Sequence, residues 1–327
     1  MAGMFLMLML TAVFTAGCKK DVGTPEDNAV VAAEEDEESE GEEETGYVLG
    51  YSCINLTNPF YDTLKTAIQT SLEEEGATLI VKNPEGDVNV QISQIEEMIE
   101  EGVDAVFLSP ADWEEITPAL EALKEADIPV INLDTQVKET DLIEAFIGSD
   151  NKNAGYVCGE DLLAQRPDGG KILIVESSGI NSVNERITGF EEAIANGGFE
   201  VLDRISEDSG DVREAMAAAL ARFPEIDAVM CGNDQMAEKV YQAVKEAGRT
   251  DILIYGVDGS PEIKKLLAAG ENAMAGTGAQ SPIHMGKTAA ETALSILNGE
   301  DYEEEVCVDT FFINRDNVEM YGTDGWQ

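Results

Sequence analysis

Apolar and polar residues alternate along the chain in two periods, one typical of buried strands and one typical of amphipathic helices. After a first apolar run, Phe60, Leu64, Ile68 and Leu72 fall on one helical face, and Gly76 ends that pattern. Further helical faces alternate with apolar runs, and strands are expected at 47–54, 77–81, 104–109 and 128–134. This order predicts a parallel sheet with helices on both faces.

The same alternation starts again after Gly148. Strands are expected at 171–177, 199–206, 226–234, 252–258 and 273–279, with helices between them that carry Val183, Ile187 and Phe190 and later Met236. The sequence therefore predicts an α/β protein of two Rossmann-like lobes, each a parallel sheet flanked by helices. The join near 146–151 contains no long linker, so a cleft between the lobes is expected.

The first residues form a short apolar run that ends in Thr15-Ala16-Gly17-Cys18. The run is too short for a membrane-spanning helix, and small residues precede the cysteine. Residues 1–18 resemble a bacterial lipoprotein signal, in which Cys18 would be lipidated and become the new N-terminus. The alternative is an ordinary secretory signal with a chance cysteine.

The composition is strongly acidic, with 66 acidic and 20 basic residues and a formal charge of −46. Nine of the eleven residues from Glu34 to Glu44 are acidic, so residues 19–46 are expected to form a disordered tether. That segment carries −10, which leaves −36 from Tyr47 onward. So acidic a surface excludes nucleic acid as a partner and limits membrane association to a lipid anchor.

The residue types that carry catalysis or metal binding are sparse. No CxxC pair and no Cys/His metal spacing occurs, and His284 is the one histidine of the chain. No nucleophile elbow or EF-hand loop is visible. We therefore expect no catalytic residue, metal or cofactor. Buried free thiols are expected for the remaining cysteines, which are Cys53, Cys158, Cys231 and Cys307.

Polar and aromatic residues follow the predicted strands, where ligands bind in open parallel sheets. They are Asn58, Phe60, Tyr61, Asp134, Arg186, Asn233, Asp258 and Gln280. Carboxylates, amides and a guanidinium suit the hydroxyl groups of a small polyhydroxylated ligand, and aromatic faces suit its C–H patches. We expect Phe60 and Tyr61 to be covered by such a ligand and by the opposite lobe.

Each of these residues also has a purely structural explanation. Asn58 before Pro59 is a good helix N-cap, and Asn233 fits the same role. Asp134 and Asp258 could shape turns. Arg186 could pair with a neighbouring glutamate, Glu185 or Glu192, and no closer opposite charge is evident in the local sequence. Their joint placement at strand ends favours a binding site.

Six motifs together resemble the ribose-type periplasmic sugar-binding proteins of type I. They are TNPFY, INLDTQ, NERITGF, CGNDQMA, GVDGSP and AGTGAQ, and the resemblance covers the chain from Tyr47 to about Ile313. It implies two lobes, 47–148 with 280–307 and 149–279 with 308–327, joined by a three-segment hinge near 148–150, 277–280 and 306–310. It also implies that Asn58, Phe60, Tyr61 and Asp134 face a sugar from the first lobe, and Arg186, Asn233 and Asp258 from the second, with Gln280 near the hinge.

Two positions depart from the ribose-type pattern. Thr135 stands where ribose binders carry an arginine, and Ser209 and Gly210 stand near the place of an aromatic residue. The pocket that includes Thr135 thereby loses a charge and a stacking face. Both changes argue against ribose itself and favour a larger or differently oriented sugar.

The resemblance implies an extracytoplasmic, lipid-anchored solute-binding protein of a bacterial cell membrane. It would capture a monosaccharide or related polyol and deliver it to the permease subunits of an ABC importer. The alternative is a sugar-sensing receptor that hands its closed form to a histidine kinase or chemoreceptor. A second alternative is a transcription regulator, which would need a DNA-binding helix pair before Tyr47, where the acidic segment stands. A third is a hydrolase, which would have to form product from the bound sugar.

Overall fold

The computed structural model describes residues 46–327, so the expected signal with Cys18 and all but the last residue of the expected tether lie outside it. Within this part of the chain, the first of two sheets runs in the order β11-β5-β4-β3-β1-β2, with all neighbours parallel. Its strands are β1 (Val48–Ser52), β2 (Thr78–Lys82), β3 (Ala105–Leu108), β4 (Val130–Leu133), β5 (Ala145–Ser149) and β11 (Glu305–Val308).

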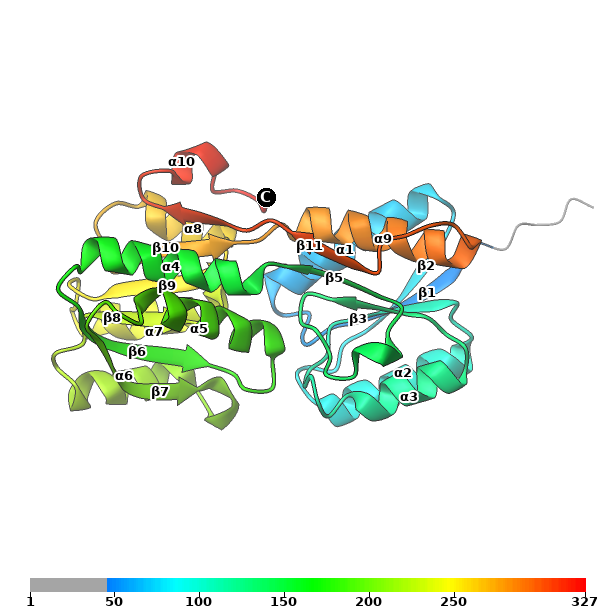
Figure 1. Ribbon diagram of the computed structural model, residues 1–327, viewed down its shortest axis with the longest axis horizontal. Helices are drawn as coiled ribbons and strands as arrows, with labels where there is room; N and C mark the ends of the chain where they lie inside the picture. The colour runs from blue at the N-terminus through cyan, green and yellow to red at the C-terminus, as the bar shows by residue number, and fades with distance from the viewer. Residues whose placement is uncertain (1–45) are drawn as a thin grey trace, which may run out of the picture. The chain divides into compact units, whose positions relative to one another are not determined.

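The second sheet has the same plan, in the order β12-β10-β9-β8-β6-β7. Its strands are β6 (Gly170–Glu176), β7 (Phe199–Ser206), β8 (Ala228–Cys231), β9 (Leu253–Asp258), β10 (Met274–Ala279) and β12 (Phe311–Asn314). The edge strand β12 runs antiparallel to β10, while the other neighbours are parallel. The predicted pair of parallel α/β units is thereby confirmed, and Figure 1 shows the two sheets with their helices.

Helices cover both faces of the first sheet and form the first lobe with it. α1 (Pro59–Glu74) and α9 (Pro282–Asn298) bury Leu64, Ile68 and Met285 against one face. α2 (Val88–Glu101) and α3 (Thr117–Glu125) cover the other. α3 begins at Thr117, because Pro118 sets its first turn and the preceding residues form turns. The short 3₁₀ helix Thr140–Leu142 precedes β5.

The second lobe is built in the same way. α4 (Asn151–Gln165) and α5 (Asn181–Ile194) cover one face of its sheet. α6 (Val212–Arg222), α7 (Asp234–Glu246) and α8 (Pro261–Ala268) cover the other. The 3₁₀ turn Glu207–Ser209 follows β7, and the short α10 (Val318–Tyr321) follows β12. The periodic positions Val183, Ile187 and Phe190 are all buried, as the pattern predicts.

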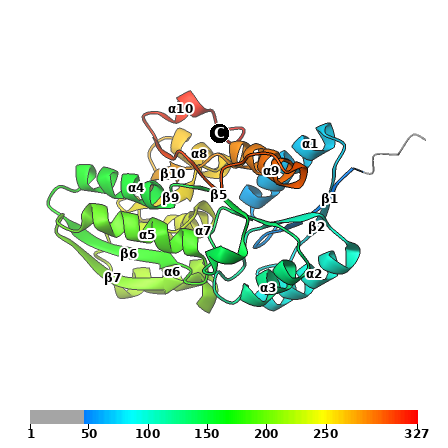
Figure 2. The same cartoon turned by 45° about the vertical axis from the view of Figure 1, so that its right-hand side comes forward.

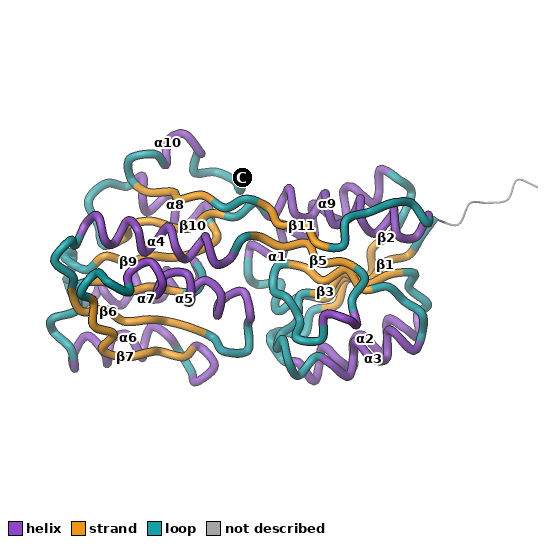
Figure 3. Tube along the Cα trace, in the orientation of Figure 1, coloured by secondary structure: helices purple, strands orange, loops and turns teal. Residues whose placement is uncertain are grey.

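The chain passes between the lobes three times. β5 ends at Ser149 in the first sheet and α4 begins at Asn151 in the second lobe. β10 of the second sheet leads to α9 of the first lobe, and β11 leads to β12 of the second sheet. Figure 3 shows the neighbouring strands β5 and β11 running toward the second lobe. The crossings bring the carboxyl ends of the two parallel sheets face to face.

The last residues, 322–327, return from α10 toward the first lobe. Figures 1 and 2 both show the C-terminus where the two lobes meet. The buried Lys264 donates a 2.5 Å hydrogen bond from Nζ to the carbonyl oxygen of Gly325, and Trp326 packs on the core of the first lobe. Because this segment contacts both lobes, it adds a further connection between them.

The cysteines of the described residues are all free thiols. Cys53, Cys158 and Cys231 are buried, as expected, but Cys307 is exposed. The expectation for Cys307 was wrong because β11 is an edge strand, so one of its flanks and alternate side chains reach solvent. None of the helices between residues 46 and 327 has the length and apolar character of a membrane-crossing helix.

Candidate functional site

A cleft of about 420 Å³ lies between the carboxyl ends of the two sheets. The first lobe lines it with Ile54, Asn55, Thr57, Asn58, Phe60, Tyr61, Gly86, Ala111 and Asp134. The second lobe lines it with Ser177, Ile180, Ser182, Val183, Arg186, Glu207, Asp208, Asn233, Gln235, Lys239 and Asp258. Seven of the nine sequence-predicted ligand-binding residues are therefore brought together, all but Thr135 and Gln280.

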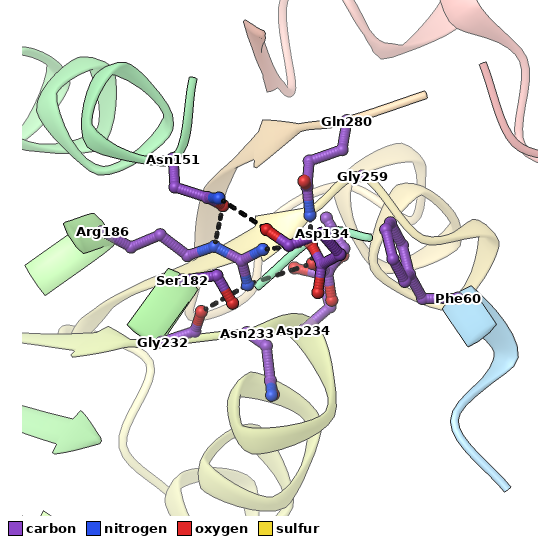
Figure 4. A network of polar contacts seen from close by, with 12 residues as sticks. Phe60, Asp134, Asn151, Ser182, Arg186, Gly232, Asn233, Asp234, Gly259 and Gln280 are labelled. Atoms are coloured by element: carbon purple, nitrogen blue, oxygen red, sulfur yellow. Dashed lines mark hydrogen bonds and ion pairs between the residues drawn. The ribbon is translucent and has the colours of Figure 1, made fainter. Parts of the chain in front are cut away.

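Arg186 of α5 lies at the centre of a buried polar network, shown in Figure 4. Its Nε donates to Oδ1 of Asn151 at 2.8 Å, and its Nη1 donates to the carbonyl oxygen of Gly232 at 3.0 Å. Nη1 also contacts Oδ1 of Asp258 at 3.3 Å, and Nη2 contacts Oδ1 of Asp134 at 3.5 Å. The guanidinium is thus held in one orientation, and it joins the two lobes through Asp134.

These contacts exclude the structural alternative that the sequence left open for Arg186. Arg186 does not pair with Glu185 or Glu192 at the surface; its ionic partners are Asp134 and Asp258. Glu192 instead pairs with Lys152. Asp134 and Asp258 are far from Arg186 in the sequence, so they could not be identified as its partners there. They follow strands that lie near α5 only in the folded chain.

Asp134 follows β4 in the left-handed backbone conformation, with φ of 60°. Its Oδ2 accepts a 2.9 Å hydrogen bond from the hydroxyl of Tyr61, and its backbone carbonyl accepts from Nδ2 of Asn151. Burial raises the pKa of Asp134, while Arg186 and then the Tyr61 hydroxyl oppose this shift. Asp134 therefore connects the aromatic wall of the cleft to the guanidinium.

Asp258 follows β9 and also has a positive φ, 138°. Nε2 of Gln280 donates to its Oδ1 at 2.9 Å. Burial raises the pKa of Asp258 to about 8, opposed mainly by Arg186 and reinforced by the charges of Asp234 and Asp134. Asp134 and Asp258 share a single guanidinium, and the nearby carboxyl group of Asp234 also has a raised pKa, so the network favours proton retention on its carboxyl groups.

The aromatic pair lines the cleft and is largely buried by other side chains, and its contact with a ligand stays a prediction. Phe60 is 2% exposed and Tyr61 5% exposed. The two rings meet edge to face at 5.3 Å, and the ring of Trp326 meets Phe60 at 5.8 Å and 77°. Trp326 was missed in the sequence, because it follows residues 322–325, which have no helical or strand period.

Asn58 and Asn233 are both helix N-caps and cleft-lining residues. Oδ1 of Asn58 accepts from the backbone N–H of Phe60 at 2.9 Å, and Oδ1 of Asn233 accepts from that of Met236 at 2.8 Å. The structural explanation of these residues is therefore correct as well. The cap uses the side-chain oxygen of each asparagine. The side-chain N–H groups are not needed for the cap and can donate to a ligand.

Thr135 and Gln280 lie beside the cleft and are fully buried. The hydroxyl of Thr135 accepts a 3.1 Å hydrogen bond from the backbone N–H of Ser182, across the lobes. Gln280 holds Asp258, and its Oε1 is a buried atom with no hydrogen-bond partner among the described residues. A contact of either residue with a ligand stays a prediction.

Sequence reasoning missed the polar wall of the second lobe, formed by Ser177, Glu207, Asp208 and Lys239. The hydroxyl of Ser177 donates to Oδ1 of Asp208 at 2.6 Å, and Nζ of Lys239 lies 2.6 Å from Oε1 of Glu207. In so acidic a chain no single carboxylate stands out. The missing aromatic near Gly210 was the one sign that this wall differs.

Asn151 was also missed, although it follows the first crossing at the start of α4. Its buried side chain accepts from Arg186 and donates to the backbone of Asp134, so it contacts one residue from each lobe. A polar residue directly after an apolar strand could have been found by the reasoning that selected Asp134. Together with Arg186, Asp134, Asp258 and Tyr61, it completes a site that can bind neutral hydroxylated molecules through fixed donors and acceptors.

Comparisons with known proteins agree with this arrangement. A family model described as a periplasmic binding protein domain matches residues 49–301. A ribose import binding protein of Escherichia coli is 29% identical over 257 residues, which is 78% of this chain and 86% of the relative. The Bacillus subtilis ribose import binding protein is 30% identical over 263 residues, 80% of this chain and 85% of the relative.

Solved structures show the same fold. An ABC transporter solute-binding protein from Mycobacterium smegmatis with bound glycerol superposes with a TM-score of 0.79 at 28% identity. The superposition covers 84% of this chain and 96% of that protein. The two-lobed α/β architecture is therefore shared with a solute-binding protein whose structure contains glycerol.

Proposed function

The chain belongs to the periplasmic binding protein family, and on that basis we propose that it captures a monosaccharide in the cleft and delivers it to an ABC importer. The observation that carries this proposal is the position of Arg186. It bridges Asp134 of the first lobe and Asp258 of the second inside a cleft that both lobes line. A ligand that satisfies these groups contacts both lobes at once.

The chemistry of the cleft suits sugar hydroxyls. Carboxyl oxygens of Asp134 and Asp258 accept hydrogen bonds, a protonated carboxyl group also donates one, and the amides of Asn58 and Asn233 donate them. Hydrogen bonds to charged groups are the stronger ones, and burial keeps water from competing for them. The relatives named for ribose and the structure with glycerol bind ligands of this chemical class.

Binding, without a chemical step, is the proposed mechanism. The three crossings near 148–150, 277–280 and 306–310 form the hinge, so the lobes are 47–148 with 280–307 and 149–279 with 308–327. Domain closure around a ligand is a known motion, for which periplasmic binding proteins are a standard example. Cross-lobe hydrogen bonds such as the 3.0 Å contact from Trp113 N–H to the Gly179 carbonyl would separate when the cleft opens. The closed surface is the form that the permease subunits would recognise.

The family places the protein outside the cytoplasm, and we further propose a lipid anchor at Cys18. Residues 1–18 would be the signal, and residues 19–46 an acidic tether that keeps the lobes away from the membrane. Two or more acyl chains are needed for stable attachment, which a diacylated cysteine supplies. Membrane fractionation of wild type and Cys18→Ala tests this, and an equally soluble wild type would contradict it.

A thermal-shift screen over pentoses, hexoses, furanoses, deoxy sugars and polyols tests the proposed function. A ligand that binds only the folded state raises the melting temperature in proportion to the logarithm of its concentration above Kd. We expect at least one monosaccharide or polyol to do so, and Asp258→Ala to remove the shift. A screen without any stabilising sugar or polyol would contradict the proposal.

A further inference from the structure

The two walls of the cleft differ in chemistry. Phe60 and Tyr61 are the aromatic residues in the described lining, and both belong to the first lobe. The second-lobe lining includes Glu207 and Asp208 of the 3₁₀ turn after β7 and Lys239 of α7. A ligand stacked on the first lobe therefore presents its other end to charged groups rather than to a ring.

The Glu207–Lys239 pair is free to contact a ligand, whereas Asp208 is not. Oδ1 of Asp208 accepts from Ser177 Oγ at 2.6 Å and its Oδ2 accepts from the Ser178 backbone N–H at 3.2 Å. The Glu207 and Lys239 side chains are 29% and 43% exposed, and the pair uses one carboxylate oxygen and one N–H. A second carboxylate oxygen and two further N–H groups remain for hydrogen bonding.

The pair also lies apart from the buried network around Arg186. The side chains of Arg186, Asp134 and Asp258 are at most 6% exposed, whereas Glu207 follows the edge strand β7, which β6 and β8 separate from β9 and Asp258. The cleft volume of about 420 Å³ lies in the range of about 300–1,000 Å³ that is typical of small-molecule sites. A pentose, with about ten non-hydrogen atoms, leaves part of such a cleft empty, while a hexose with about twelve fills more of it.

We propose that the Glu207–Lys239 pair determines specificity by hydrogen-bonding hydroxyl groups at the outer end of the ligand, which makes the ligand a hexose or a polyol of similar length. This inference rests on the proposed sugar-binding function. A pentose held by Arg186, Asp134 and Asp258 has no group that reaches the pair, and its affinity does not depend on it. A hexose has an additional hydroxymethyl group that meets both a donor and an acceptor there.

Titration calorimetry with matched sugars tests this inference. D-ribose and D-allose, D-xylose and D-glucose, and L-arabinose and D-galactose differ within each pair by a hydroxymethyl group. We expect the wild type to bind the hexose of at least one pair more tightly than its pentose. The Glu207→Ala/Lys239→Ala double variant should lose about tenfold or more in hexose affinity, as for a lost hydrogen bond to a charged group, and leave the pentose within about twofold.

Lys245→Ala is the matched control, because Lys245 lies on the same helix α7, is exposed, and contacts Tyr241 instead of the cleft. It should keep the wild-type ratio of affinities. Equal melting temperatures of the variants in the absence of sugar exclude misfolding. A double variant that keeps the hexose preference, or a wild type that prefers pentoses throughout, overturns the inference alone. A wild type that binds no sugar overturns the proposed function with it.

Discussion

Arg186 of the second lobe and Asp134 of the first lobe form a buried ion pair, with Nη2 3.5 Å from Oδ1. Both side chains are at most 4% exposed. The same guanidinium contacts Asp258, so one cation links the ends of strands in two different sheets. The two residues of this pair therefore contribute to the stability of the protein, and they are also the residues that would bind the proposed sugar.

Arg186→Ala should therefore destabilise the protein as well as weaken ligand binding. Removing one partner of a buried ion pair leaves uncompensated charge and costs about 3–5 kcal/mol. We expect a loss of this size in the free energy of unfolding at pH 8, measured by urea denaturation. The loss should be smaller at pH 5, because Asp258, with a pKa of about 8, is then protonated and needs no compensating charge.

Arg213→Ala provides the comparison for this variant. Arg213 pairs with Glu246 on the surface, where both side chains are about half exposed. Exposed ion pairs contribute little to stability, because water and salt screen their charges. Equal stabilities of Arg186→Ala and Arg213→Ala at pH 8 would contradict the claim that Arg186 compensates buried carboxyl groups.

The pH dependence of stability follows from the raised pKa of Asp258. Its pKa is about 8 in the folded protein and near 3.8 in the unfolded chain, so the folded state binds more protons between these values. The contribution of Asp258 to the free energy of unfolding should therefore be complete below pH 4. It should decrease as the pH rises toward 8. Burial raises the pKa of Asp134 and Asp234 in the same direction.

Asp258→Asn should flatten this dependence, because the amide does not titrate. Melting temperatures of wild type and variant at intervals from pH 5 to pH 8 give the measurement. A wild type that gains stability over this range would contradict the assignment of a raised pKa.

Trp326 should support the aromatic wall of the cleft. The Trp326–Phe60 contact of 5.8 Å is the kind of edge-to-face pair worth about 0.5–1.5 kcal/mol beyond area burial. Trp326→Ala should lower the melting temperature and weaken sugar binding, and Trp326→Phe should restore part of both. Met320→Ala is a suitable control, since Met320 is 81% exposed in the same C-terminal region. A Trp326→Ala variant as stable as this control would show that the contact is unimportant.

Closure about the three crossings should make the protein more compact when it binds sugar. Small-angle scattering of residues 46–327 with and without a saturating ligand measures the radius of gyration. We expect a decrease, because a ligand that contacts Asp134 and Asp258 holds both lobes. An unchanged radius at saturation would indicate a rigid site.

The sequence predicted the two lobes because the periodic signal is local. Leu64, Ile68 and Leu72 repeat within a few residues, and burial of that face follows from the spacing alone. The ends of the strands could also be predicted, because polar residues such as Asp134 and Asn233 follow largely apolar runs. Their convergence follows from the rule that carboxyl ends of parallel strands share one edge.

The partners of Arg186 could not be predicted in the same way. Asp134 and Asp258 lie 52 and 72 residues from it, and only the packed fold decides which of the chain's 66 acids faces the guanidinium. The Glu207–Lys239 pair could not be predicted for the same reason, because the chain contains so many acidic residues. Trp326 belongs to a segment without a period, and the edge position of Cys307 depends on the order of strands in the sheet.

The central claim is that the Arg186–Asp258 network binds a sugar in the cleft between the lobes. Titration calorimetry of wild type, Asp258→Ala and the exposed-loop control Asp168→Ala, with the sugar found by thermal shift, tests it most directly. A hydrogen bond to a charged group is worth about 1.5–3 kcal/mol, so Asp258→Ala should bind at least about tenfold more weakly than the other two. Equal affinity of all three proteins for the sugar would contradict the claim.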